Sequence, residues 1–214
     1  VSVLYTSDLV ELTQASFADV VEIDGDFKVE AAPALAKVGP PAWSKLATIT
    51  GLLKVKNNAK LKSFALPALK RVTGTSPGSW TVELYSCRVL RVFSLPALEE
   101  VGAFAGAVAQ AGEGSGVYFG SQFDKMRVLD FASLKRAGQL TVNHVTLGNK
   151  DWNDDAADMA ALGTTWAACE LRFDALESLT GDGSSSALTV RAYNVGRVDH
   201  PCSLSSCSLA LVVF

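Results

Sequence analysis

The sequence has little of what metal centres and hydrolytic active sites are made from. Among its 214 residues it has two histidines, His144 and His200, and four cysteines. It contains no Gly-x-Ser-x-Gly elbow, Walker loop, dinucleotide fingerprint or His-Glu-x-x-His pair. Paired carboxylates remain as a catalytic option, but the outward positions of the strands predicted below are mostly Lys, Thr, Tyr and Arg. We therefore expect neither an enzyme nor a bound cofactor.

Long hydrophobic runs are also missing. Spanning a bilayer takes ~18–20 consecutive apolar residues, whereas the longest run here, LALVVF at 209–214, is the size of one strand. The chain begins at Val1 rather than Met, which suggests a processed product whose signal peptide has been removed. We expect an extracellular or cell-surface protein without a transmembrane segment.

The few cysteines allow more than one interpretation. Cys202 and Cys207 flank a short serine-rich loop, and in a secreted protein they are predicted to form a local disulfide. The alternative is four free, buried thiols in a cytosolic protein. A zinc site made of His200, Cys202 and Cys207 is a further alternative, but we expect no metal site. The pairing of Cys87 and Cys169 stays open.

The pattern that is present is a repeat, clearest in residues 51–74, GLLKVKNNAKLKSFALPALKRVTG. Leu53 and Val55 alternate with lysines, which is the period-2 signature of a strand with one buried face. Asn57-Asn58 then favours a turn, because short amide side chains tolerate left-handed backbone. This stretch is interpreted as one complete coil of a β-solenoid.

One sequence motif, which we call the phrase, recurs along the chain. It consists of an apolar residue, two spacers, Leu or Val, two spacers, an apolar residue, then Gly. Its starts lie 26, 23, 29, 36 and 42 residues apart, at Phe17, Trp43, Leu66, Leu95, Phe131 and Phe173. Such a period predicts a solenoid, and the lengthening intervals predict insertions. A strand is predicted after each Gly, over 27–29, 53–55, 80–84, 117–119, 140–142 and 188–190. A third short strand is predicted before the next phrase, as at 61–64, 90–93 and 126–129. The glycines are expected at corners that need positive φ.

The expected fold is mainly β: a single solenoid domain of about six coils over 1–214, with helical and loop additions. Residues 1–16 are predicted to form a helical cap, with Asp8 and Glu11 as a capping-box variant. Coils occupy 17–198, and 199–214 form a C-terminal strand or cap.

Three insertions interrupt the later coils, and the last, residues 181–186, is expected to be a flexible hairpin-like turn. Residues 103–116, small and Gly-rich, are expected to form a long loop. Residues 147–165 are expected to contain a helix begun by Asp154 or Asp155. A calcium loop starting at Asp151 fits less well, because the sixth position lacks Gly and the twelfth lacks Glu.

The charges are unevenly distributed. Residues 1–36 hold seven acidic groups and one lysine, whereas residues 37–71 hold eight basic groups and no acid. Part of this pattern is explained by stacking, since Glu30, Lys56 and Glu83 are predicted to align as an alternating ladder.

Candidate binding residues come from the basic block and the tryptophans. Lys54, Lys60 and Lys62 are candidates for contacts with an anionic glycan or lipid headgroup. Nucleic acid is not an expected partner, because the block lacks interleaved arginine and aromatic residues. Trp152, in an insertion, is the candidate exposed aromatic contact. Two other tryptophans are predicted to be core, Trp43 at the repeat position of Leu66 and Trp80 at that of Leu53.

The combination G-x-L-x-V-x-N-N-x-x-L-x-S-[LF]-x-LPAL-x-x-V-x-G, clearest over about 43–102, resembles the receptor L-domain family. That family includes the ligand-binding domains of insulin and epidermal growth factor receptors, and GPI-anchored fungal cell-wall proteins are closest in phrasing. The resemblance implies a right-handed, leucine-rich-repeat-like β-helix that is displayed outside the cell and binds proteins or serves in a wall.

Two functional hypotheses follow from the sequence. In the first, the protein is structural and assembles with copies of itself or with other extracellular proteins into a coat, wall or filament. In the second, it is a recognition module that binds a protein or glycan through the side that carries the insertions.

Overall fold

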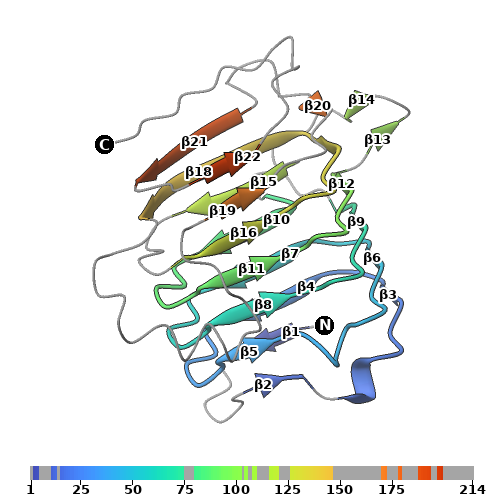
Figure 1. Ribbon diagram of the computed structural model, residues 1–214. Helices are drawn as coiled ribbons and strands as arrows, with labels where there is room; N and C mark the ends of the chain where they lie inside the picture. Colours follow the sequence, from blue (N-terminus) through green and yellow to red (C-terminus); the bar gives the residue numbers. More distant parts are fainter. Residues whose placement is uncertain are drawn as a thin grey trace.

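The computed structural model describes residues 2–4, 11–13, 15–74, 80–102, 104–105, 108–109, 116–120, 126–146, 170–172, 178–179, 188–193 and 197–199. These residues are mainly β and are organised in three parallel sheets, which we call A, B and C (Figure 1). All strand pairs within the three sheets are parallel.

Each sheet collects one strand from each successive coil of the chain. Sheet A has the order β1 (Ser2–Leu4), β4 (Phe27–Glu30), β7 (Leu53–Lys56), β10 (Val82–Tyr85), β15 (Gly116–Gly120), β18 (Gln139–Thr146) and β21 (Leu188–Tyr193). Sheet B has the order β2 (Glu11–Leu12), β5 (Lys37–Val38), β8 (Ser63–Ala65), β11 (Val92–Ser94), β16 (Val128–Asp130), β19 (Glu170–Arg172) and β22 (Arg197–Asp199). Sheet C runs through β3 (Glu22–Ile23), β6 (Thr48–Ile49), β9 (Arg71–Val72), β12 (Glu100–Val101), β17 (Arg136–Ala137) and β20 (Ser178–Leu179).

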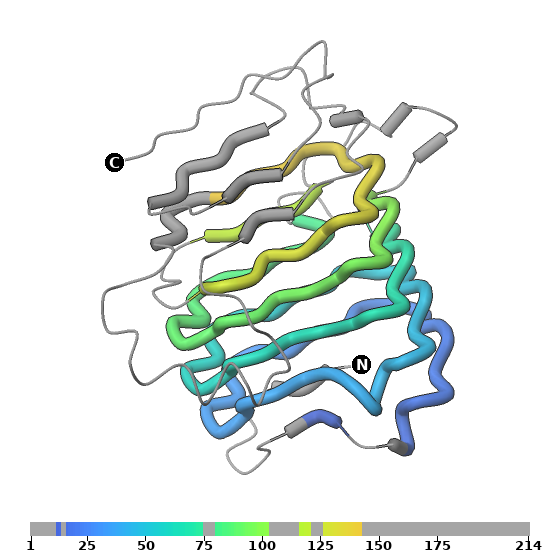
Figure 2. The backbone as a smooth tube through the Cα atoms, viewed as in Figure 1, coloured from blue at the N-terminus to red at the C-terminus, as the bar shows by residue number. Residues whose placement is uncertain are grey.

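The chain visits sheets A, B and C in turn and then repeats, so each coil lies on the one before it (Figure 2). The last apolar residue of every predicted phrase lies in sheet C, at Ile23, Ile49, Val72, Val101, Ala137 and Leu179. Every strand predicted after a phrase lies in sheet A. The prediction of a mainly β chain is therefore confirmed, and the parallel sheets are what a β-solenoid requires.

The predicted helical cap over 1–16 is wrong. Residues Ser2–Leu4 and Glu11–Leu12 are strands that pair with β4 and β5, and they are followed by a 3₁₀ turn, η1 (Ala15–Phe17). Leu12 is 6% exposed and continues the inward row of Val38 and Phe64. Burial in this row and hydrogen bonds to the next coil outweigh the local helix signal, which is weak by comparison.

The first insertion is also more ordered in secondary structure than expected. In place of a long loop, β13 (Phe104–Ala105) and β14 (Val108–Ala109) pair antiparallel, with Phe104 opposite Ala109. Pairing satisfies backbone N–H and C=O groups that a loop leaves to water. The helix predicted within 147–165 and its candidate caps, Asp154 and Asp155, lie outside the described residues.

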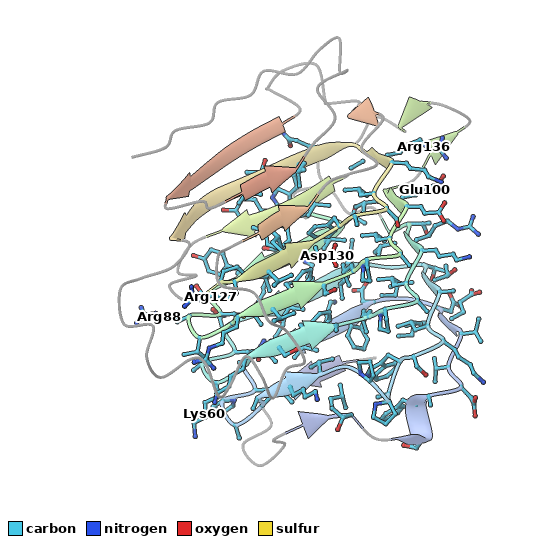
Figure 3. The ribbon with its side chains drawn as sticks, viewed as in Figure 1. Lys60, Arg88, Glu100, Arg127, Asp130 and Arg136 are labelled. Carbon is cyan, nitrogen blue, oxygen red and sulfur yellow. The ribbon has the colours of Figure 1, made fainter. Side chains whose placement is uncertain are left out.

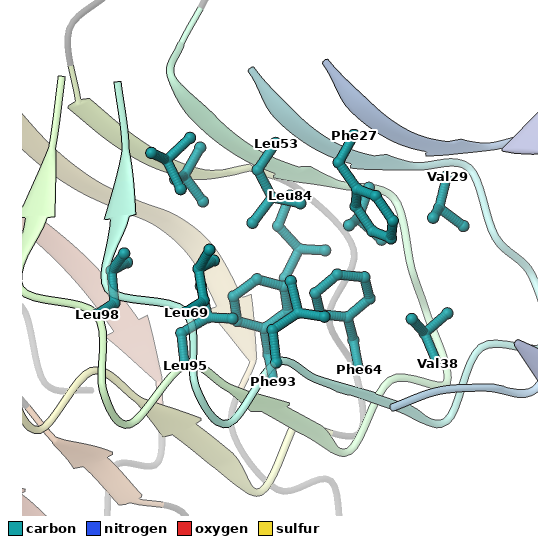
Figure 4. Close-up of a cluster of buried hydrophobic side chains, with 14 of the residues drawn as sticks. Phe27, Val29, Val38, Leu53, Phe64, Leu69, Leu84, Phe93, Leu95 and Leu98 are labelled. Atoms are coloured by element: carbon teal, nitrogen blue, oxygen red, sulfur yellow. The ribbon is translucent and has the colours of Figure 1, made fainter. Parts of the chain in front are cut away.

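The inward side chains of the three sheets form one continuous core (Figure 4). Phe64 and Phe93, neighbours in sheet B, stack with ring centroids 5.1 Å apart and planes 10° apart. Phe93 also meets the edges of Phe119 and, at a tilt, Phe131. Trp43 is fully buried as predicted, and its ring stacks on Phe17 at 4.6 Å.

The corner between sheets A and B has the same backbone conformation in three coils. Ala31, Asn57 and Ser86 each follow a sheet A strand with φ of 50°, 56° and 51°. The left-handed turn predicted at Asn57 is therefore confirmed. Asn58, fully buried beside it, accepts a hydrogen bond from Ala32 N–H at 3.0 Å and donates one to the Val29 carbonyl at 2.8 Å.

Replacing Asn58 with alanine is expected to lower the free energy of unfolding by about 2 kcal/mol, because it leaves a buried N–H and a buried C=O of the preceding coil without their partner. Urea unfolding followed by circular dichroism measures the change. Lys60→Ala is the neighbouring control, since the Lys60 side chain is exposed and its φ is not positive. An Asn58→Ala protein no less stable than Lys60→Ala would contradict this role for the buried amide.

The glycines at the corner between sheets C and A serve two different purposes. Gly25 and Gly102 have φ of 109° and 106°, as predicted for corners that need positive φ. Gly51 and Gly74 have no such φ, and close contact between coils explains them instead. A Cβ on Gly51 would lie 2.4 Å from Asp26 Oδ1, and one on Gly74 would lie 2.2 Å from the Gly51 carbonyl carbon.

Candidate functional site

The outer face of sheet A carries two rows of charged and aromatic residues. One row runs Lys28, Lys54, Glu83 and Tyr118, and the other runs Glu30, Lys56 and Tyr85. The predicted ladder is therefore correct for Glu30 and Lys56, which lie opposite each other. It is wrong for Glu83, which lies opposite Lys54, two residues before Lys56. The Glu83 carboxylate nevertheless contacts both rows, lying 2.7 Å from Lys56 Nζ and 3.8 Å from Lys54 Nζ.

The same two-residue difference moves Trp80 out of the core. Val82, not Trp80, lies opposite Leu53. Trp80 is only half-buried and stacks on the Tyr118 ring, with centroids 5.2 Å apart and planes 20° apart. The prediction that Trp80 is core is wrong, because the connection from Gly74 to β10 is longer than the matching connection before β7. A half-buried aromatic pair beside sheet A was thus missed; the alternating Trp-Thr-Val-Glu-Leu pattern of residues 80–84 gave no sign of it.

An alternating charge ladder does form, but at sheet C. Arg71, Glu100 and Arg136 occupy one register row, and Arg136 donates a hydrogen bond to Glu100. Lys135 lies 3.2 Å from Glu99 one position earlier. These pairs join successive coils on one side of the stack, where Figure 3 shows Glu100 and Arg136. Because opposite charges on neighbouring strands are favourable, these pairs help to hold successive coils together.

The N-terminal coil is joined to the next by acidic groups. Asp19 accepts a hydrogen bond from Lys45 at 2.6 Å, and this bond lowers the pKa of Asp19 and raises that of Lys45. For Asp26, partial burial acts to raise the pKa, but hydrogen bonds from Lys28 and the Leu52 N–H outweigh it, so the pKa lies below its ordinary value of 3.8. Ionised Asp26 therefore stabilises the fold above that value, and its contribution is lost as the pH falls through the folded pKa.

The candidate lysines do not form one patch. The Lys54 side chain is 13% exposed and lies near Glu83 on sheet A. Lys60 and Lys62 are exposed at the corner between β7 and β8. Lys60 and Arg88 lie along that corner, across the stack from Glu100 and Arg136 (Figure 3). Trp152 and the predicted Cys202–Cys207 disulfide lie outside the described residues.

Cys87 is the described cysteine, and it is a free thiol in the core. It takes the corner position that Asn58 has one coil earlier, with its Sγ 3.5 Å from the Tyr85 carbonyl oxygen. Burial raises the pKa of the Cys87 thiol to about 11, although hydrogen bonds from Asn58 oppose the shift. Such a thiol is a packing group rather than a nucleophile, because the reactive form is the thiolate.

Cys87 is expected to resist alkylation in the folded protein. A rise from the ordinary pKa of 9.0 to about 11 makes the thiolate about a hundredfold rarer at pH 8, and burial slows access further. Iodoacetamide labelling with peptide mass spectrometry should show the Cys87 peptide modified at least about a hundredfold more slowly in buffer than in 8 M urea. Comparable rates in the two solvents would show that the thiol is accessible in the folded chain.

Within the described parts of the chain, no cluster of three or more His, Cys, Asp or Glu residues is placed to hold a metal ion. No helix among the described residues has the length and apolar character needed to cross a membrane.

The two ends of the stack present strand edges. Among the described strands, β1 and β2 pair on one side only, with β4 and β5, and β21 and β22 pair on one side only, with β18 and β19 (Figure 1). A strand paired on one side offers a row of backbone N–H and C=O groups to another chain.

No protein-family model, curated protein or solved structure matches this chain.

Proposed function

We propose that this chain is a right-handed β-solenoid of the receptor L-domain type. In this proposal it is a non-enzymatic structural protein of the extracellular space or cell surface, and it assembles with copies of itself or with other extracellular proteins into a coat, wall or filament. The repeat phrase, with its L-domain character, supports the fold type and the location. The observation that carries the assembly is the pair of strand edges at each end of sheets A and B.

The surface between these ends also supports a structural role. Many of its charges are used between coils, in the contacts of Glu83 with Lys56, Glu99 with Lys135 and Asp19 with Lys45. Exposed pairs of this kind add little to stability because water and salt screen them, so their main effect is on which coil lies on which. A stack whose described end strands pair on one side only is suited to end-to-end association.

The alternative, recognition of a protein or glycan, is supported by a different surface from the one first expected. The insertions do not all leave the stack at one corner: in chain order the first and third follow sheet C and precede sheet A, whereas the second follows β18 of sheet A and precedes β19 of sheet B. The outer face of sheet A instead offers the Trp80–Tyr118 stack and Tyr85, which is 38% exposed. Flat aromatic side chains beside charged groups suit a sugar ring. A glycan array probed with wild type and Trp80→Ala tests this alternative.

The test of the structural function uses the purified full chain. Sedimentation velocity and negative-stain electron microscopy, over a range of protein and salt concentrations, should show rods, filaments or sheets that grow with protein concentration. A species that stays monomeric throughout would overturn the assembly function.

A further inference from the structure

We propose that copies of this chain stack head to tail, with β21 and β22 of one copy forming parallel pairs with β1 and β2 of the next; this inference rests on the proposed structural function. The occupant of each open edge is therefore a second copy of the same chain. A register row is the set of residues that pair with one another in successive strands of a sheet. In the proposed stack, a row that ends at β22 of one copy continues at β2 of the next copy. The residues at the two ends of each row must therefore be suitable neighbours.

A register row of sheet B with charged residues at both ends carries the strongest part of the argument. It runs Glu11, Lys37, Ser63, Val92, Val128, Glu170 and Arg197. The row begins with an acid beside a base and ends with an acid beside a base. Stacking a second copy on β22 places its Glu11 next to Arg197, so the sequence of charges becomes Glu170, Arg197, Glu11 and Lys37. Opposite charges then alternate across the junction as they do within each end, and opposite charges at neighbouring positions are favourable.

The next row of sheet B is apolar along its whole length. It runs Leu12, Val38, Phe64, Phe93, Leu129, Leu171 and Val198. Four members of this row, Val38, Phe64, Phe93 and Leu129, are fully buried. A second copy brings Leu12 to the register position next to Val198, so this apolar row continues across the junction without a polar residue.

Sheet A continues in the same way. One row begins at Ser2 and ends at Thr141 and Thr189, and the next begins at Val3 and ends at Val142 and Val190. The junction would put Ser2 beside Thr189 and Val3 beside Val190. Hydroxyl pairs and β-branched pairs are favourable neighbours in sheets. All four junction rows therefore match in a single register.

Strand direction and symmetry agree with this arrangement. Every pairing in sheets A and B is parallel, so a second copy that stacks by translation and rotation along the stack keeps the direction of every strand. Sheet C ends one coil earlier among the described residues, at β20, so the described junction consists of sheets A and B. A head-to-tail contact uses different surfaces on its two sides and does not close, which produces a filament.

The N-terminal end has the charge that this junction needs. Glu22 in β3 and the neighbouring Asp19 and Asp24 are exposed, and residues 1–36 hold seven acidic groups against one basic group. The last 36 residues, by comparison, hold two acidic and two basic groups. Two acidic N-terminal ends repel each other, which disfavours contact between like ends.

Charge reversal at the junction tests the register. Arg197→Glu and Glu11→Lys should each raise the protein concentration at half-assembly about tenfold, which corresponds to about 1.4 kcal/mol for each contact. The double variant restores an opposite pair at the junction and should return to within about threefold of wild type. Lys60→Glu, with the same change of charge as Arg197→Glu but in the middle of the stack, should assemble as wild type does. Thermal unfolding of each variant checks that it is folded.

Cysteine crosslinking gives a readout that does not depend on these charges. In the Ser2→Cys, Thr189→Cys double variant, the two cysteines of adjacent copies would lie on neighbouring strands about 4.8 Å apart, a Cα separation that a disulfide allows. Oxidation should give a ladder of multimers on non-reducing gels. Leu4→Cys with Thr189→Cys, displaced by two residues along β1, should give no more ladder than wild type.

The outcomes separate the two proposals. A wild-type protein that never assembles overturns the structural function together with this junction. A wild-type protein that assembles, but whose charge-reversed variants assemble equally well or whose Ser2–Thr189 pair crosslinks no better than Leu4–Thr189, overturns the junction alone.

Discussion

Replacing Phe93 with alanine is expected to lower the free energy of unfolding by about 4 kcal/mol, within the range for truncating a fully buried phenylalanine. Phe93 is the centre of an aromatic cluster, with its ring 5.1 Å from Phe64, 5.5 Å from Phe119 and 5.9 Å from Phe131. Truncation removes three ring contacts together with the burial of the side chain. Urea unfolding followed by tryptophan fluorescence measures the loss.

The size of this effect follows from the position of Phe93 between sheets. Phe64 lies beside it in sheet B, whereas Phe119 reaches it from sheet A. Because close-packed interiors collapse only partly around a lost side chain, a cavity adds to the lost transfer free energy. Loss of Phe93 would therefore weaken the packing of one sheet on another as well as the contacts within sheet B.

Tyr85→Ala is the matched control, because Tyr85 is an aromatic residue on the outer side of sheet A and is 38% exposed. Its loss should cost less than about 1 kcal/mol, as is usual for surface positions. A Phe93→Ala protein that differs from Tyr85→Ala by less than about 1 kcal/mol would contradict the central place given to the aromatic cluster.

Replacing Gly74 with alanine is expected to cost about 3 kcal/mol, at the upper end for added atoms in a well-packed region. The new Cβ would lie 2.2 Å from the Gly51 carbonyl carbon and 2.3 Å from its oxygen. These are backbone atoms of the preceding coil, held by the hydrogen bond from Gly74 N–H to the Gly51 carbonyl at 3.0 Å. No side-chain rotation relieves the contact, so the two coils must move apart.

Gly25→Ala separates this contact from backbone strain. A Cβ on Gly25 meets nothing within 4 Å, but its φ of 109° is unfavourable for alanine, with an expected cost of about 1–2 kcal/mol. Thermal unfolding of both variants by calorimetry should place Gly74→Ala below Gly25→Ala in melting temperature. The reverse order would mean that positive φ, and not the approach of the coils, is what the glycines in this corner supply.

The charged side chains of sheets A and C have a consequence for function. Glu83 lies within reach of two lysines, and Arg136 lies against Glu100. Charges that are already paired between coils are poorly placed to hold a ligand, since binding would first have to separate them. This is why the ends of the stack, rather than the lysines of residues 51–74, are the surfaces on which the proposed assembly depends.

Several features followed from residue identity because they depend on local alternation and on repetition. The repeated phrases that end at Val72 and Val101 both place their last residue in sheet C, and, as predicted, Leu53 and Val55 are buried while Lys54 and Lys56 face outward. Even the misplaced strand after Gly74 kept its inward and outward faces, because a two-residue slip preserves a period of two.

By itself the sequence determined the periodic core, the order of strands and the left-handed turn at Asn57. Only the tertiary structure decided that Glu11–Leu12 is a strand, that Trp80 stacks on Tyr118 outside the core, and that Glu83 lies opposite Lys54. The physical reason is that each of these depends on the neighbouring coil, to which a strand is hydrogen-bonded across about 25 residues of chain or more. The lengths of the intervening connections set that register, and the local strand propensities of the residues do not determine it.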